Sequence, residues 1–224
     1  FYYARAVDCT MLAALGSLAA QQENPMQTTL KNAQQLLDYT ASNPDATVTY
    51  QPSDMVLAVH SNVSYLSETK AHSRAGGHFF LSEIDEVPTN NGAILTIAQI
   101  IKVVLSSATE AELGALYINS HEAMPQRQLL EEMGHPQPAP TTVTTDNITA
   151  QGLTMGTMTP KASKSNDQRF NWLKCRNAQC QFKYLWRKGI LNRADYTSKH
   201  HPARHHQNVR KFYVFDSDQL PAYQ

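Results

Sequence analysis

Four positions in the chain carry side chains suited to metal-assisted chemistry. Glu112, Asp146 and Asp195 each present a carboxylate, either at the end of an expected strand or on an expected helix. Carboxylate oxygens placed in this way are the ligands that hard divalent cations prefer. The fourth position is Asn62, which ends the apolar run 57–62 where such a site would have its first aspartate. The pattern therefore predicts a cation site in which one acid is replaced by an amide.

The chemistry of such a site is phosphodiester hydrolysis. Two divalent ions held by three or four carboxylates activate a water on one side of the phosphorus and stabilise the leaving oxygen on the other. No protein nucleophile is needed. This agrees with a sequence that contains neither a nucleophile elbow nor a Cys/His catalytic signature.

Each acid also has a purely structural explanation. Glu110 and Glu112 lie at the start of an expected helix, where the helix dipole favours acidic residues. The pair Asp146-Asn147 could simply form the N-cap of the helix that follows, and Asp195 could be a surface acid among basic neighbours. Taken singly, each is more often structural than catalytic. The order and contexts of the acids together are much more specific than any one of them.

The hydrophobic pattern predicts an α/β domain with a mixed sheet of five strands, an antiparallel meander plus parallel strands, flanked by helices. The meander consists of three expected strands, 56–61, 76–82 and 93–99, with a turn over 64–74. Strands 141–145 and 181–187 complete the sheet. The expected helices are 4–21, 26–43, one starting at 109, one ending before a Gly134 cap, 147–155, 165–178 and one after 191.

Charge is distributed unevenly along a chain whose formal net charge is zero. Residues 160–211 contain 13 Lys and Arg residues against two acids, Asp167 and Asp195. This surplus, with Trp172, Tyr184 and Trp186 interleaved, suggests a polyanionic partner, although a solvated basic face is an equally good interpretation. The candidate nucleic-acid contacts are Lys164, Arg169, Arg187, Lys188, Arg193 and Lys199.

Zinc binding is a weaker alternative for the same region. It contains the pair Cys175 and Cys180 and the histidines His200, His201, His205 and His206. The two cysteines are spaced more widely than the usual C-x2-C pair of a zinc site. We therefore interpret Cys175 as a buried thiol on a helix and the histidines as a solvated basic cluster.

Several classes of protein are excluded by composition. No apolar stretch approaches the roughly 20 residues that span a bilayer, and three cysteines are too few for a disulfide framework. The segment beginning at Phe1 has no basic region followed by an apolar one, so we expect no secretory signal. We expect a piece of a longer protein with one main domain, in a reducing compartment and without a membrane.

The motifs resemble the ribonuclease H domain of copia-type LTR retrotransposon Pol polyproteins. The resemblance covers roughly residues 53–206. The phrases that carry it are His60-Ser-Asn-Val-Ser-Tyr-Leu-Ser, Ser73-Arg-Ala-Gly-Gly-His-Phe-Phe-Leu-Ser, Ser106-Ser-Ala-Thr-Glu-Ala-Glu-Leu, Leu129-Leu-Glu-Glu-Met-Gly, Thr145-Asp-Asn, Ala194-Asp and Thr197-Ser-Lys-His-His. The stretch that includes Ala33-Gln-Gln-Leu-Leu-Asp-Tyr is similar to the connection between the reverse transcriptase and this domain.

The resemblance implies a ribonuclease H fold that holds two Mg²⁺ (or Mn²⁺) ions with four acids and cleaves the RNA strand of an RNA–DNA hybrid. The four acid positions fall on Asn62, Glu112, Asp146 and Asp195, with Glu112 rather than Glu110 matching the second motif. Many ribonucleases H have a catalytic histidine before the fourth acid. The loop 187–193 has none, and either Lys188 serves in its place or nothing does.

The amide at Asn62 leaves two functional classes open. An amide oxygen can coordinate a cation, but it removes a full negative charge from a site that depends on charge. The chain is then either a weakened hybrid-specific endonuclease or a catalytically inactive nucleic-acid-binding module. The expected divisions are a helical remnant of the reverse transcriptase connection (1–50), the ribonuclease H-like domain (51–206) and a tail (207–224). The expected location is cytoplasmic, in a virus-like particle, or nuclear.

Overall fold

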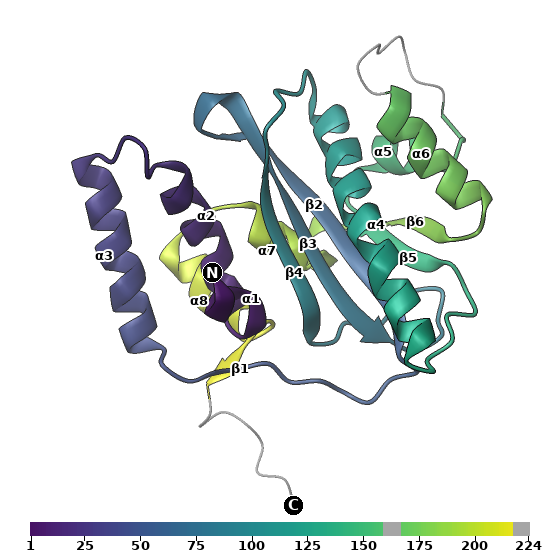
Figure 1. The fold of residues 1–224 in the computed structure, drawn as a ribbon, viewed down its shortest axis with the longest axis horizontal. Coiled ribbons are helices and arrows are strands. Elements are labelled where there is room, and N and C mark those ends of the chain that lie inside the picture. The colour runs from purple at the N-terminus through teal and green to yellow at the C-terminus, as the bar shows by residue number, and fades with distance from the viewer. Residues whose placement is uncertain (159–166, 217–224) are drawn as a thin grey trace, which may run out of the picture.

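The computed structural model describes residues 1–158 and 167–216 (Figure 1). Its elements are α1 (Tyr2–Ala6), the 3-10 helix η1 (Cys9–Met11), α2 (Leu12–Ala20), α3 (Gln27–Ser42), β1 (Ala46–Thr47), β2 (Val56–Glu68), the 3-10 helix η2 (Thr69–Ala71), β3 (His72–Ser82), β4 (Ala93–Ile101), α4 (Ala108–Glu132), β5 (Thr141–Thr145), α5 (Ile148–Thr154), α6 (Asp167–Ala178), β6 (Phe182–Trp186), the 3-10 helix η3 (Gly189–Leu191), α7 (Ala194–Ser198), α8 (Ala203–Arg210) and β7 (Phe215–Asp216).

The main sheet has five strands in the order β4-β3-β2-β5-β6. Strands β2, β3 and β4 form an antiparallel meander, while β5 runs parallel to β2 and β6 runs parallel to β5. This confirms the mixed sheet expected from the sequence. The central strand β2 pairs on both sides: His60 lies opposite His78 of β3 and opposite Thr144 of β5.

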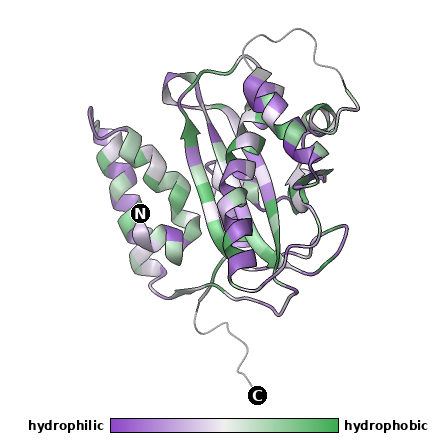
Figure 2. Ribbon diagram, turned by 45° about the vertical axis from the view of Figure 1, so that its right-hand side comes forward, coloured by the Kyte–Doolittle hydropathy of each residue, from purple (hydrophilic) through white to green (hydrophobic). Residues whose placement is uncertain are grey.

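Helices cover both faces of the sheet (Figure 1). On one face α4, α5 and α6 close a core that includes Leu57, Val59, Phe79, Leu116 and Leu173. Figure 2 shows hydrophobic residues along the strands behind α4. Because successive side chains of a strand point to opposite faces, Ala58, between Leu57 and Val59, belongs to the other side, where α7 packs against β2 and β3.

The end of β2 differs from the sequence-based expectation. The strand was expected to stop at residue 61 and a turn to occupy 64–74, but the connection is only η2 (Thr69–Ala71), inside that range. β2 continues to Glu68, and its pairing with β3 extends to Ser64 opposite Arg74 and to Glu68 opposite His72. A buried ion pair stabilises this extra pairing of β2 with β3. The Arg74 side chain is fully buried and donates to the Glu68 carboxylate at 2.8 Å. Asn62 therefore lies inside a strand rather than at its exit.

The long helix α4 replaces the two helical stretches expected over the same residues. It starts at the N-cap Ser107, whose hydroxyl accepts from the backbone N–H of Glu110 at 3.1 Å, and it continues through Pro125. The helix ends at Glu132, and Gly134 occupies the expected C′ position after it. That residue has φ +88°, and its N–H donates to the carbonyl of Glu131 at 3.1 Å, an arrangement typical of a glycine C′ cap.

The N-terminal helices pack beside the sheet against α7 and α8. The expected helix 4–21 is broken at Asp8, which caps η1 by accepting from the backbone N–H of Thr10 at 3.1 Å. Leu12 is buried in a second apolar cluster together with Tyr196 and Tyr213. Helix α3 is more exposed, and its large apolar residues in contact with solvent are Met26 at the N-cap, Leu30 and Leu37.

Candidate functional site

Asn62 and Asp195 are 133 residues apart in sequence and are joined by a hydrogen bond. The Asn62 amide nitrogen donates to Asp195 Oδ1 at 2.9 Å, and also to the hydroxyl of Ser198 at 2.9 Å. Asn62 comes from the middle of β2 and is 1% exposed, while Asp195 and Ser198 come from the short helix α7. The structure thus brings the first and fourth predicted positions into direct contact.

Glu112 enters the same region from the first turns of α4. Its carboxylate is buried and accepts from the hydroxyl of Thr145 at 3.5 Å, at the end of β5. Burial raises the pKa of Glu112 to about 8, and the negative charge of Asp146 contributes to this rise in pKa. A buried acid whose pKa is raised by a second acid is typical of a functional site.

Asp146 follows the last residue of β5 and completes the group. Burial raises the pKa of Asp146 and so does the charge of Asp195, whereas the charge of Lys199 lowers it. Asp146 is not the helix cap considered from sequence: Asn147 caps α5 by accepting from the N–H of Ala150 at 2.9 Å. Of the pair Asp146-Asn147 considered as an N-cap, Asn147 is the capping residue, and the cap does not use the carboxylate of Asp146.

We refer to Asn62, Glu112, Asp146 and Asp195 as the carboxylate cluster. Two strands and two helices bring these side chains together through strand pairing and helix packing. Their donor set, three carboxylates and one amide, fits a hard divalent cation by chemistry. In the described part of the chain, however, no group of three or more His, Cys, Asp or Glu side chains is already arranged to hold a metal ion.

One cation is already present at the cluster. The Lys199 ammonium, from the C-cap residue of α7, forms an ion pair with Asp195 Oδ1. Its charge also lowers the pKa of Glu112. Sequence reasoning placed Lys199 among the nucleic-acid contacts and gave no signal for this pairing, because the facing acids come from distant segments.

Glu110 has a structural role, as its position suggested. Its carboxylate accepts from the backbone N–H of Ser106 at 2.8 Å and from the hydroxyl of the same residue. These bonds fix the first turn of α4, two residues before Glu112. The structure therefore separates a capping acid from an acid that faces the cluster.

A polar network positions the segment that carries Asp195. The imidazole Nδ1 of His60 accepts from the backbone N–H of Arg193 at 2.9 Å, and the Asn192 amide donates to the carbonyl of Ser61 at 2.8 Å. Burial holds the pKa of His60 well below its usual value, so the ring stays neutral and can accept. His60 was recognised from sequence only as part of a motif, since its partner lies 133 residues away.

Only some of the predicted nucleic-acid contacts lie close to the carboxylate cluster. Arg187, Lys188 and Arg193 lie in or beside the loop between β6 and α7, next to the cluster, and the Arg193 guanidinium packs over the ring of Phe212 at 4.3 Å. Arg169 lies apart from them on α6, with its guanidinium 5.8 Å from the ring centroid of Tyr117 on α4. Lys164 lies outside the described residues.

The aromatic residues interleaved with this basic region are only partly available for stacking. Trp186 is 40% exposed, whereas Tyr184 is 1% exposed and shares a hydrogen bond with Ser120 at 3.2 Å. Tyr184 lies in the core beneath α4. It is therefore excluded as a platform for a nucleobase.

The positions of the cysteines differ from the sequence-based expectation. Cys175 and Cys180 are both exposed, so the interpretation of Cys175 as a buried thiol is wrong. The buried positions of α6 are Phe170 and Leu173, and Cys175 falls on a different side of the helix. Within residues 1–158 and 167–216 the cysteines and histidines form no metal-binding group.

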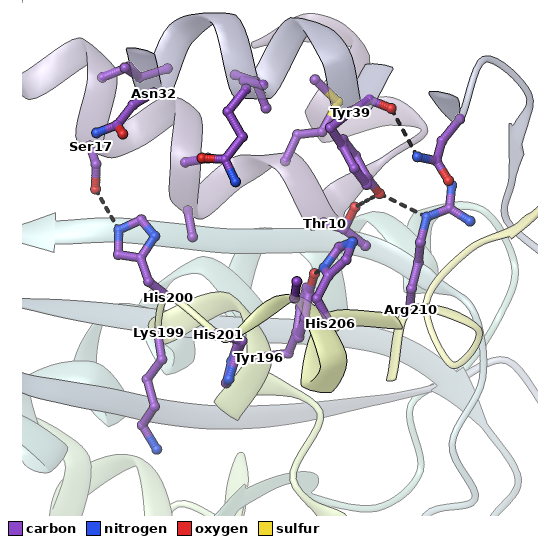
Figure 3. A pocket seen from close by; sticks show the side chains of 18 of the residues that line it. Thr10, Ser17, Asn32, Tyr39, Tyr196, Lys199, His200, His201, His206 and Arg210 are labelled. Carbon is purple, nitrogen blue, oxygen red and sulfur yellow. Dashed lines mark hydrogen bonds between the residues drawn. The ribbon is translucent and has the colours of Figure 1, made fainter. Parts of the chain in front are cut away.

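A cavity of about 580 Å³ lies between the N-terminal helices and the α7–α8 segment (Figure 3). It is lined by polar side chains such as Ser17, Tyr39 and His200, and the Ser17 hydroxyl is 2.9 Å from the His200 Nε2. Lys199 also contributes to its wall, but Figure 3 shows the Lys199 side chain extending away from Ser17 and His200. The cavity is therefore beside the carboxylate cluster and separate from it.

Solved structures that resemble this chain are distant from it in sequence. A foamy viral protease–reverse transcriptase (dRH) in complex with double-stranded DNA aligns with a TM-score of 0.50 and 11% identity, over 84% of this chain and 30% of that one. The foamy viral protease–reverse transcriptase in complex with an RNA/DNA hybrid aligns with a TM-score of 0.41 and 13% identity, over 90% and 22% of the chains. LC11-RNase H1, isolated from compost by a metagenomic approach, aligns with a TM-score of 0.45 and 12% identity, over 64% and 92%.

Comparisons at the level of sequence identify no relatives. No protein-family model matches the chain, and no curated protein matches it. The architecture is nevertheless specific: a three-stranded antiparallel meander continues into two parallel strands, and helices cover both faces. The chain has the mixed five-stranded sheet, antiparallel and parallel, flanked by helices, that the sequence predicted.

Proposed function

We propose that this chain is the ribonuclease H domain of a copia-type retroelement polyprotein, and that it cleaves the RNA strand of RNA–DNA hybrids with activity reduced by Asn62. The observation that carries the proposal is that the Asn62 amide donates to Asp195, while burial and the charge of Asp195 raise the pKa of Asp146, and burial and the charge of Asp146 raise that of Glu112. These are the four positions that the sequence motifs assign to metal-binding acids. Strand β2, helix α4 and helix α7 each supply one of them, and Asp146 directly follows strand β5.

The chain's own residues would hold Mg²⁺ or Mn²⁺ through Glu112, Asp146, Asp195 and the amide oxygen of Asn62. When bound, such ions supply charge stabilisation and an activated water for in-line displacement at phosphorus. His60 and Asn192 keep the Asp195 segment in place. Arg187, Lys188 and Arg193, beside the cluster, would contact the phosphate backbone of the hybrid.

The loss of charge at Asn62 determines how much activity remains. A carboxylate at this position would contribute to charge stabilisation that is worth several kcal/mol in metal-dependent hydrolases. Replacing it by an amide is expected to cost roughly 3 kcal/mol of transition-state stabilisation. We therefore expect slow cleavage by the natural chain and a large gain for Asn62→Asp, measured with a labelled hybrid and Mg²⁺.

A second candidate function is hybrid binding without cleavage. The Asn62 amide is integrated into its surroundings, since it donates both to Asp195 and to Ser198. A site adapted to the amide in this way would keep the fold and the basic surface without the chemistry. Cleavage absent from both the natural chain and Asn62→Asp, combined with hybrid binding by both, would favour this alternative.

The proposed setting follows from the sequence motifs. We propose a polyprotein in which residues 1–50 continue from a reverse transcriptase, with a hybrid as substrate, in the cytoplasm within a virus-like particle or in the nucleus. No helix in the described ranges is long and apolar enough to cross a membrane. Co-purification of this chain with a reverse transcriptase portion, when the two are expressed as one polypeptide and cleaved between them, would test the partnership.

A further inference from the structure

Helix α7 presents an acid and a base to the same surface. Asp195 lies in its first turn and Lys199 follows its last residue, four positions later. The backbone of Lys199 is extended, with φ −128° and ψ 158°, so the chain leaves the helix at this residue. The Lys199 ammonium contacts Asp195 Oδ1, with side chains 44% and 28% exposed respectively. By itself, such a pair is an ordinary helix-surface ion pair.

The surroundings make this pair unusual. The oxygen that Lys199 contacts, Asp195 Oδ1, is also the acceptor for the buried amide of Asn62. Two donors, one of them fully charged, thus converge on one carboxylate oxygen of the cluster. A divalent cation that used this oxygen as a ligand would meet the positive charge of Lys199 at contact distance.

The influence of Lys199 reaches beyond Asp195. Its charge lowers the pKa of Asp146 and of Glu112, so the ammonium lies within the field of all three acids. Three carboxylates placed close together repel one another, and a nearby cation offsets that repulsion. In Figure 3, the Lys199 side chain runs away from His200 and the cavity.

We propose that Lys199 is a built-in counter-cation of the carboxylate cluster and that its ammonium must leave Asp195 before a divalent cation binds there. This inference rests on the proposed function, because it takes the cluster as the metal site. Lys199 stabilises the metal-free cluster and weakens metal binding by competing for it. Its flexible four-carbon stem allows the ammonium to move away without any change in the helix.

The test is a titration of the nucleic-acid-free, full-length chain with Mn²⁺, followed by the electron paramagnetic resonance signal of unbound Mn²⁺. The parents are the natural chain and Asn62→Asp, and the test variants add Lys199→Met or Lys199→Gln to each. Removing the charge is expected to tighten Mn²⁺ binding on the order of tenfold. Lys199→Arg keeps the charge and is expected to bind like its parent. Lys31→Met, which removes an exposed lysine from α3, is the matched control.

A second readout separates this role from a structural one. Without metal, the neutral variants are expected to unfold at a lower temperature than their parents, and saturating Mn²⁺ is expected to raise their melting temperature by more. Lower stability with unchanged or weaker Mn²⁺ affinity would overturn the inference and leave an ordinary ion pair. Absence of Mn²⁺ binding in both parents and in every variant would instead contradict the proposed function itself.

Discussion

The Asn62 amide donates a 2.9 Å hydrogen bond to Asp195 Oδ1 in the centre of the candidate site. An ionised carboxylate at position 62 could not donate this bond. The natural amide attracts the Asp195 carboxylate, whereas the aspartate expected from the motif would repel it. The amide stabilises the cluster without metal. An aspartate would leave two acids facing each other until a cation joins them.

The first prediction concerns stability without metal. Asn62→Asp replaces a buried donor by a second negative charge beside Asp195, and is expected to lower the free energy of unfolding in EDTA by on the order of 2 kcal/mol. Mg²⁺ is expected to restore more stability to this variant than to the natural chain. Thermal unfolding with and without Mg²⁺ measures both effects. An equal response of the two proteins to Mg²⁺ would count against a metal site at residue 62.

The second prediction concerns hybrid binding. Affinity is expected to fall steeply between low and physiological salt and to depend little on base sequence, since binding to phosphates releases counterions. Replacing Arg187 and Lys188 by Gln is expected to reduce the slope of log affinity against log salt by about 0.7–0.9 for each phosphate that is no longer neutralised. Lys31→Gln on α3 serves as the control. A salt-independent affinity of the natural chain would exclude backbone recognition.

The third prediction concerns the N-terminal helices. Leu12 is 4% exposed and packs in the cluster with Tyr196, whereas Leu30 on α3 is 71% exposed. Leu12→Ala is expected to cost about 2–4 kcal/mol of unfolding free energy, and Leu30→Ala almost nothing. Urea denaturation of both variants tests the difference. Equal stability would mean that the helix carrying Leu12 does not share the folding unit.

The fourth prediction concerns acid stability. His78 is fully buried, and burial lowers its pKa to about 4. The folded state therefore holds the neutral ring while the unfolded chain takes up a proton below the ordinary pKa. Stability from this residue is complete above about pH 6.5 and is lost as the pH falls towards 4, by roughly 3 kcal/mol.

His78→Phe is the variant that tests this linkage. It keeps the packing against Phe80 and Tyr213 and removes the titrating group. The variant is expected to lose less stability than the natural chain between neutral pH and about pH 4.5 in urea denaturation. His121→Gln, at an exposed position of α4, is the control. An unchanged acid dependence in His78→Phe would show that another group dominates.

The sheet was largely predictable from the sequence because its strands are local apolar runs. Val56 to His60 and Thr141 to Thr145 read as strands without knowledge of the fold, and both are confirmed. The extension of β2 to Glu68 was not predictable. It depends on a polar segment that pairs with β3 and on the burial of Arg74, which are properties of the tertiary structure.

The site was predictable only in its residue types. The resemblance to a known family assigned the four positions of the cluster, and the structure places two of them, Asn62 and Asp195, in contact. The same reasoning missed the partners that set their electrostatics: Thr145 beside Glu112, Ser198 beside Asn62 and Lys199 on Asp195. Serine, threonine and lysine are common surface residues, and nothing in the local sequence distinguishes these from others.

The central claim is that Asn62 occupies the place of a metal-binding aspartate in a hybrid-cleaving site. The direct measurement is the rate of RNA-strand cleavage in an RNA–DNA hybrid with Mg²⁺, compared between the natural chain and Asn62→Asp. The variant is expected to be on the order of 100-fold faster, because restored charge is worth a few kcal/mol in the transition state. Asp146→Asn in the same background is expected to abolish the gain. Equal and robust Mg²⁺-dependent cleavage by the natural chain and by Asn62→Asp would contradict the claim.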